Sequence, residues 1–123
     1  MSDTSGAADV TSFLVELKKT IAKATPGSGG FVLVPRKENR DCLAALGFTL
    51  RDVEVTLQAL TVADYSEGPV LDMDVRGELW VFGKEIMGQE VYVKLKLARL
   101  GPSAAVRVVS FHFAQNPLSY PYR

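Results

Sequence analysis

The chain has 123 residues, 47% of them hydrophobic, and its 14 Lys and Arg residues balance its 14 Asp and Glu residues. This length suits one domain with its own core, and the neutral balance argues against strong non-specific binding to nucleic acid, which usually leaves a basic footprint. The single cysteine, Cys42, excludes an internal disulfide and suits a reducing cytoplasm, and no apolar run approaches the ~18 residues of a membrane-spanning helix.

The N-terminal residues are small and polar, and we expect a flexible tail over residues 1–8 and a single domain over residues 9–123. Apolar residues then recur at the spacing of one helix face, at Val10, Phe13, Leu14, Leu17 and Ile21. Asp9 or Thr11 is the expected N-cap, and Pro26-Gly27 places a loop after the helix.

Residues 31–48 predict a short strand and a helix. The run over 31–34 is apolar and stops at Pro35, and the helix that follows ends at Gly47, with one side formed by Cys42, Leu43 and Leu46. Thr49 and Asp52 have the spacing of a capping box. They predict a further helix whose apolar face is Leu50, Val53, Leu57 and Leu60.

The second half of the chain predicts a sheet. Residues 61–78 are acidic and lack periodicity, so we expect a long surface loop in which Asp72 and Asp74 are solvated. Three strand-like runs follow, at about 79–86, 90–98 and 105–113, with Gly88-Gln89 as a hairpin turn. Helices followed by a meander of strands indicate the α+β class, with the N-terminal helices packed on a small antiparallel β-sheet.

Two of these strands have one apolar and one polar side. The second strand carries Tyr92, Lys94 and Lys96 opposite a side of Val and Leu residues. In the third, Val109, Phe111 and Phe113 form the expected core side, and the other side carries Val106, Val108, Ser110 and His112. The length of the connection places Lys94 opposite Ser110 and Tyr92 opposite His112, and the turn at Gly88-Gln89 places Glu85 opposite Tyr92. A slip of one residue would exchange every face.

This set of side chains suits cleavage of RNA without a metal. The 2′-hydroxyl must lose a proton, the leaving 5′-oxygen must gain one, and cations must offset the charge of the phosphorane. His112 can take part in either proton transfer at neutral pH. Basic residues dominate the chain from Leu79 onward, where only two acidic residues oppose Lys84, Lys94, Lys96, Arg99, Arg107 and Arg123.

A structural interpretation stands beside the catalytic one. Lysines on the exposed face of a strand are usually solvated and discourage edge-to-edge aggregation. A single histidine beside phenylalanines usually has a structural role, and Tyr92 can simply cover the sheet. No competing motif is present: the chain has no glycine-rich phosphate loop, no CxxC, no HExxH and no second histidine, so we expect neither a metal nor a cofactor.

Three segments carry a resemblance to a known family. "LQALTVADYSEGP", "LWVFGKEIMGQEVYVKLKL" and "VVSFHFAQNPLSYPY" resemble the MqsR family of bacterial toxins, which have a RelE-like ribonuclease fold. The resemblance extends over residues 46–122. It implies a type II toxin–antitoxin role in the cytoplasm, in which the toxin is an endoribonuclease that cleaves mRNA and arrests growth.

The resemblance also implies which residues form the site. Its catalytic residues fall on Tyr92, Lys94 and His112, and we add Lys84 as a replacement cation. The remaining polar residues of the predicted face are candidates for binding the substrate: Glu85, Lys96, Arg107 and Ser110. Two positions depart from the family pattern, which has a glutamine at Val81 and a lysine near Glu67.

The implied partner is a cognate antitoxin, typically a helix-turn-helix protein encoded by the adjacent gene, which alone would connect the toxin to operator DNA. Two alternatives stay open. The chain could be an interaction module that keeps the RelE-like fold and an antitoxin-like or DNA-binding partner but has lost catalysis. It could also act only as a co-repressor in complex with its antitoxin.

Overall fold

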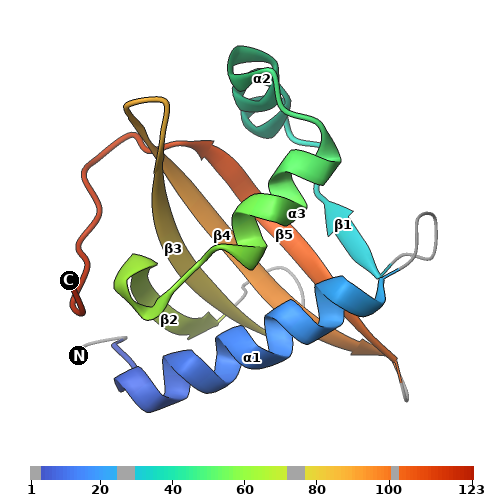
Figure 1. The fold of residues 1–123 in the computed structure, drawn as a ribbon, viewed down its shortest axis with the longest axis vertical. Coiled ribbons are helices and arrows are strands. Elements are labelled where there is room, and N and C mark those ends of the chain that lie inside the picture. The colour runs from blue at the N-terminus through green and yellow to red at the C-terminus, as the bar shows by residue number, and fades with distance from the viewer. Residues whose placement is uncertain (1–3, 25–29, 72–76, 101–102) are drawn as a thin grey trace.

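The computed structural model describes residues 4–24, 30–71, 77–100 and 103–123 (Figure 1). Its elements are, in chain order, α1 (Ala7–Lys23), β1 (Phe31–Leu33), α2 (Lys37–Leu46), α3 (Leu50–Gln58), the 3-10 helix η1 (Val62–Asp64), β2 (Tyr65–Leu71), β3 (Glu78–Ile86), β4 (Gln89–Leu100) and β5 (Ser103–Phe113). The predicted α+β class is confirmed. No helix in these ranges has the length and apolar character to cross a membrane.

The strands form one sheet in the order β1-β5-β4-β3-β2. The expectation of a wholly antiparallel sheet was wrong, because β1 runs parallel to β5 while the other pairs are antiparallel. Two α-helices, the 3-10 helix η1 and three strands separate β1 from β5 in the chain, and a connection of that length can return a strand in the same direction.

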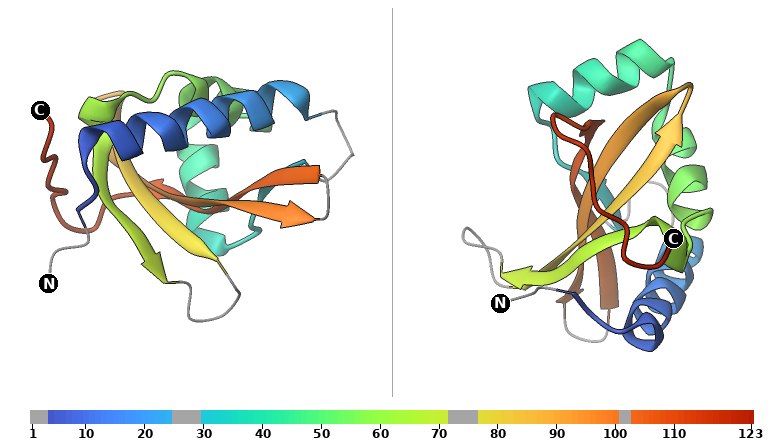
Figure 2. Two further views of the ribbon diagram at one scale, coloured as in Figure 1. Left: turned by 90° about the horizontal axis from the view of Figure 1, so that it is seen from below. Right: turned by 90° about the vertical axis from the view of Figure 1, so that its left-hand side faces the viewer.

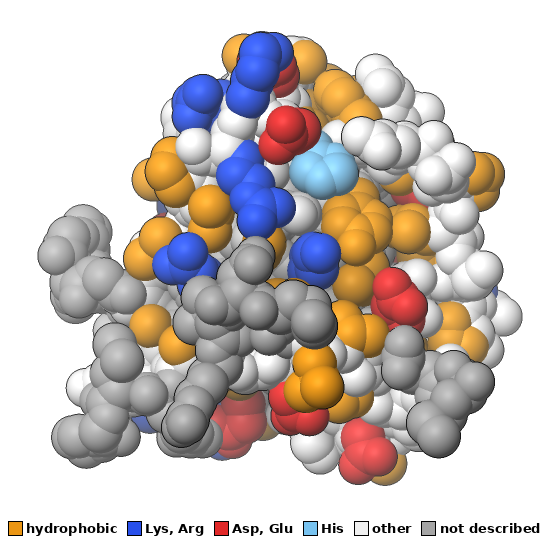
Figure 3. Space-filling model, turned by 180° about the vertical axis from the view of Figure 1, so that it is seen from behind, with side chains coloured by type: hydrophobic (Ala, Val, Ile, Leu, Met, Phe, Trp, Pro, Cys, Tyr) orange, Lys and Arg blue, Asp and Glu red, His pale blue; other side chains and the backbone are white. Residues whose placement is uncertain are grey.

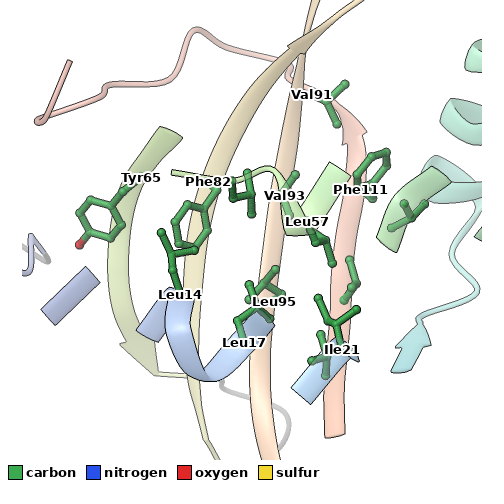
Figure 4. Packing of buried hydrophobic residues seen from close by; sticks show 14 of the residues in the cluster. Leu14, Leu17, Ile21, Leu57, Tyr65, Phe82, Val91, Val93, Leu95 and Phe111 are labelled. Atoms are coloured by element: carbon green, nitrogen blue, oxygen red, sulfur yellow. The ribbon is translucent and has the colours of Figure 1, made fainter. Parts of the chain in front are cut away.

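Helices α1 and α3 cover one face of the sheet, as the two views of Figure 2 show. The core lies between them and the sheet, where Leu14, Leu17 and Leu57 face Phe82, Val93 and Phe111 (Figure 4). We call the opposite side the rear face, defined by Val81, Gly83, Tyr92, Lys94, Ser110 and His112.

Helix α1 buries the predicted stripe of Val10, Leu14, Leu17 and Ile21. The expected caps were wrong, because the N-cap is Gly6, without a side-chain hydrogen bond. Residues 7 and 8, expected in the tail, form the first turn of α1, and the Ser5 N–H donates to the hydroxyl of Tyr65 at 2.8 Å. Residues 1–3 and the Pro26-Gly27 loop lie outside the described residues.

The ends of α2 and α3 follow the local sequence signals. Gly47 ends α2 with a φ of 71°, a left-handed conformation that glycine adopts without a steric penalty. Thr49 and Asp52 form the predicted capping box at the start of α3. Val53 and Leu57 are buried as expected, whereas Leu50 is 53% exposed.

The expectation of a loop over 61–78 was wrong in its middle part. Residues 65–71 form β2, which pairs with β3 at the edge of the sheet. The segment "SEGPV" hides this strand, because a glycine, a proline and a glutamate are all depleted in strands. Proline is tolerated at an edge, where the missing N–H need not face a neighbour. Asp72 and Asp74 lie outside the described residues.

The C-terminal segment 114–123 is irregular, as predicted, and is fastened to the sheet. Glu90 accepts hydrogen bonds from the Leu118 N–H at 3.1 Å and from the Tyr120 hydroxyl at 2.6 Å. Further along, Tyr122 stacks on Tyr65 and donates its hydroxyl proton to the Ser5 carbonyl. The segment therefore connects the edge of the sheet to the start of α1.

Candidate functional site

The register of β4 and β5 brings the predicted side chains together. Tyr92 pairs with His112 and Lys94 pairs with Ser110, as the sequence predicted. The rings of Tyr92 and His112 stack with centroids 5.4 Å apart and 20° between their planes. In the view of the rear face in Figure 3, the imidazole of this sole histidine lies at the surface, with Lys and Arg side chains beside it.

A β-bulge exchanges the two faces of β5 in the part of the strand that precedes Ser110. The register shifts between Lys94 and Leu95, so that Leu95 pairs with Val108 and Lys96 pairs with Arg107. A bulge adds one residue to one strand and thereby reverses the alternation beyond it. The prediction that Val106 and Val108 lie on the polar side was therefore wrong, because both belong to the core. Arg107 lies on the rear side instead, and it is exposed.

The backbone fixes the tautomer of His112. Its Nδ1 lies 3.0 Å from the carbonyl oxygen of Phe113. Since a carbonyl can only accept, Nδ1 carries a proton, and in the neutral ring Nε2 is left with its lone pair. Nε2 can therefore take a proton from a substrate and, once charged, return one.

Tyr92 is held as a neutral phenol. Burial raises its pKa, and the carboxylate of Glu67 raises it further. Tyr92 can therefore donate a hydrogen bond or a proton at neutral pH but cannot serve as a base. Glu67 reaches this site because β2 pairs it with Val81, which in turn pairs with Lys94.

The basic residues of this region differ in accessibility. Lys94 is half-buried, and its ammonium makes no hydrogen bond or ion pair within the described ranges. Lys96 is only 2% exposed, so this candidate for binding RNA does not offer its ammonium to solvent. Ser110 is likewise 2% exposed. Of the three candidate cations on β4 and β5, Lys94 and Arg107 are therefore accessible and Lys96 is not.

The structure does not bring Lys84 and Glu85 into this group as expected. The turn is Met87-Gly88, one residue earlier than predicted, so Gly83 rather than Glu85 lies opposite Tyr92. Glu85 pairs with Glu90. Lys84 projects to the helix-covered side, where its Nζ lies 3.1 Å from Oδ2 of the buried Asp64. Lys84 therefore cannot supply the replacement cation at the rear face.

Sequence reasoning missed Asn39, which positions β5. Its buried amide donates to the carbonyls of Val34 at 2.9 Å and Val109 at 3.1 Å, and its Oδ1 accepts the Phe111 N–H at 2.9 Å. These bonds fix the start of α2 beside Ser110 and His112. Its spacing of three residues from Cys42 was the available signal, because it places an amide on the buried side of the helix.

Comparisons with protein families, with curated proteins and with solved structures find no match to this chain. Across the described ranges, no group of three or more His, Cys, Asp or Glu side chains is placed to hold a metal ion. The chemistry of the rear face therefore has to support any functional conclusion.

Proposed function

We propose that this protein is the toxin of a type II toxin–antitoxin system, with a RelE-like fold and metal-independent endoribonuclease activity on mRNA. The observation that carries the proposal is the pairing of Tyr92 with His112 beside Lys94. An imidazole, a neutral phenol and an ammonium group share one face of the sheet there. The resemblance of residues 46–122 to the MqsR family, which implies the same three residues, also supports the proposal.

The proposed reaction is an internal transesterification. The 2′-oxygen of the substrate attacks the adjacent phosphorus, and the bond between phosphorus and the 5′-oxygen breaks. Nε2 of His112 takes the proton from the 2′-hydroxyl and returns it to the leaving 5′-oxygen, so the imidazole ends in its starting state. The Tyr92 phenol donates to a phosphate oxygen, and Lys94 offsets the added negative charge. The products are a 2′,3′-cyclic phosphate and a free 5′-hydroxyl.

The neutral net charge does not oppose this function. The rear face combines Lys94 and Arg107 with the imidazole, and Figure 3 shows basic side chains gathered near the histidine. A local basic surface on a neutral protein favours contact with a few phosphates rather than broad binding to any nucleic acid.

One observation favours the alternative of an interaction module without catalysis. Glu67 is close enough to Tyr92 to raise its pKa, and a carboxylate at that place repels a phosphate. The family pattern has a lysine near this position, and Val81, which replaces a glutamine, is fully buried. A protein of this kind would bind an antitoxin-like partner through the same fold.

Induced expression in a bacterial host distinguishes these functions. We expect growth arrest and new RNA 5′ ends bearing free hydroxyls, and we expect co-expression of the adjacent gene to restore growth. Growth arrest without new 5′ ends would favour the interaction module. Normal growth with soluble, full-length protein would exclude the toxin function.

A further inference from the structure

The start of α2 lies next to the candidate site. The right-hand view of Figure 2 shows α2 running from the rear side of the sheet toward the helix-covered side, so that its first turn lies on the rear side. The hydrogen bond from the Phe111 N–H to Asn39 fixes this turn at the level of His112. The position of the turn relative to the site is therefore set by a buried contact.

Two exposed arginines lie at this turn. Arg36 is the N-cap of α2 and Arg40 is one turn later, since the Arg40 N–H donates to the Arg36 carbonyl at 3.0 Å. The guanidinium of Arg40 donates one hydrogen bond to the Pro35 carbonyl at 2.7 Å, which orients it and leaves most of its five N–H donors available.

The acidic side chains of this turn leave the two arginines available. Lys37 pairs with Asp41 at 2.6 Å, and the other ion pairs within the described ranges are made by Arg51, Lys84 and Arg123. Neither Arg36 nor Arg40 is in ion-pair contact with a carboxylate there, although Glu38 is their neighbour in sequence. In Figure 3, basic side chains lie above and beside the histidine, and an acidic side chain lies next to it.

We propose that Arg36 and Arg40 bind phosphates of the RNA strand on one side of the cleaved bond. This inference rests on the proposed function. Guanidinium groups bind phosphate with two parallel hydrogen bonds. Both arginines belong to the first turn of α2 and not to β4 or β5, which carry the reacting groups, so they suit phosphates of neighbouring nucleotides rather than the scissile one. RNA is favoured over an acidic protein segment because the turn that carries the arginines lies beside the stacked rings of Tyr92 and His112. Aromatic rings of this kind stack on bases.

The test uses single-stranded RNA with methylated 2′-hydroxyls, which binds but cannot be cleaved. Binding is measured over a series of salt concentrations for the wild type, for Arg36→Gln, for Arg40→Gln and for the double variant. Arg51→Gln is the control, because Arg51 is an exposed arginine on α3 whose ion pair with Glu54 is also on the surface. Each single variant should reduce the salt slope by about 0.7, and the double variant should weaken binding roughly tenfold.

Several outcomes separate this inference from the proposed function. If the double variant binds the RNA with the same affinity and salt slope as the wild type and Arg51→Gln, the inference is wrong, even if unmodified RNA is cleaved. If RNA binding depends on both arginines but unmodified RNA is not cleaved, the inference is supported and the proposed ribonuclease activity is contradicted. Wild-type protein that binds no RNA at any of the salt concentrations would also overturn the inference.

Discussion

The imidazole of His112 lies against the phenol ring of Tyr92, at 5.4 Å between centroids, because the two residues are cross-strand partners on β4 and β5. The carbonyl of Phe113 accepts the Nδ1 proton of His112, so Nε2 is the ring nitrogen that remains available to a substrate. The stacking therefore orients the imidazole, and the phenol adds a second proton donor within the same site.

Tyr92→Phe separates these two contributions. The variant keeps the stacked ring but loses the hydroxyl, whose pKa is raised by burial and by Glu67. We expect RNA cleavage to slow at least ~10-fold with an unchanged pH profile, because a neutral phenol donates throughout the neutral range. Cleavage rates from pH 5 to 9 and thermal unfolding check this. If Tyr92→Phe cleaves RNA as fast as the wild type, the hydroxyl has no part in cleavage and the Tyr92 ring only positions the imidazole.

Lys84→Ala should affect stability rather than cleavage. Lys84 is bonded to Asp64 on the helix-covered side, and the Asp64 side chain is only 7% exposed. Removing this cation should cost about 1–2 kcal/mol of unfolding free energy, because Arg123 at 3.6 Å remains as a partner. Lys37→Ala, which removes an exposed pair with Asp41, is the control and should leave unfolding unchanged. If Lys84→Ala cleaves RNA more slowly but unfolds with the same free energy as the wild type, Lys84 acts in cleavage after all.

Tyr120→Phe should alter the response of stability to alkaline pH. Burial first, and then the hydrogen bond to Glu90, raise the pKa of Tyr120 far above its ordinary value. A tyrosine in the unfolded chain ionises near pH ~10, while the folded one stays protonated, so wild-type stability should fall as the pH rises above ~10. Tyr120→Phe should lose about 1 kcal/mol at pH 7 and then decline less steeply.

Urea unfolding between pH 7 and pH 11 measures this difference. Tyr122→Phe serves as the control, since it keeps the Tyr120 phenol and should decline as the wild type does. Equal alkaline slopes for Tyr120→Phe and the wild type would mean that the phenol is not buried against Glu90.

Gly83→Ala tests the contact between the C-terminal segment and the sheet. A Cβ on Gly83 would lie 2.0 Å from the Tyr120 hydroxyl oxygen and 2.6 Å from Cδ1 of Leu118, so both side chains must move. We expect a loss of about 1–3 kcal/mol. Adding Tyr120→Ala should give a double variant that is more stable than the sum of the two single effects predicts. Additive effects would contradict the contact.

Local sequence signals predicted much of the fold and the centre of the site. The capping box of Thr49 and Asp52 and the glycine at Gly47 have local physical causes, and the structure contains them. The pairing of Tyr92 with His112 was predictable because the strand faces and the connection length both constrain it. The parallel pairing of β1 was not, because it depends on contacts between distant segments.

The errors at the site come from single-residue shifts. A turn at Met87-Gly88 instead of Gly88-Gln89 changed the partner of Tyr92 from Glu85 to Gly83 without exchanging the faces of β3. Lys84 lies on the helix-covered side in either register, because it alternates with Glu85 along the strand. The bulge in β5 moved Val108 into the core, because one extra residue exchanges the two faces of the strand beyond it. Neither shift has a strong local signal, since Met87 adopts a φ of 53° that favours glycine or asparagine.

The most direct test of the central claim is the rate at which purified protein cleaves RNA in the presence of EDTA. The wild type should cleave, because Lys94 and His112 supply the charge and the proton transfer. Lys94→Ala and His112→Ala should each be slower by ~10² to 10⁴, with thermal unfolding unchanged, since neither side chain lies in the core. Lys19→Ala, an exposed lysine on α1, should cleave as the wild type does. If folded Lys94→Ala and His112→Ala cleave at the wild-type rate, or if the wild type does not cleave at all, the rear face is not a ribonuclease site.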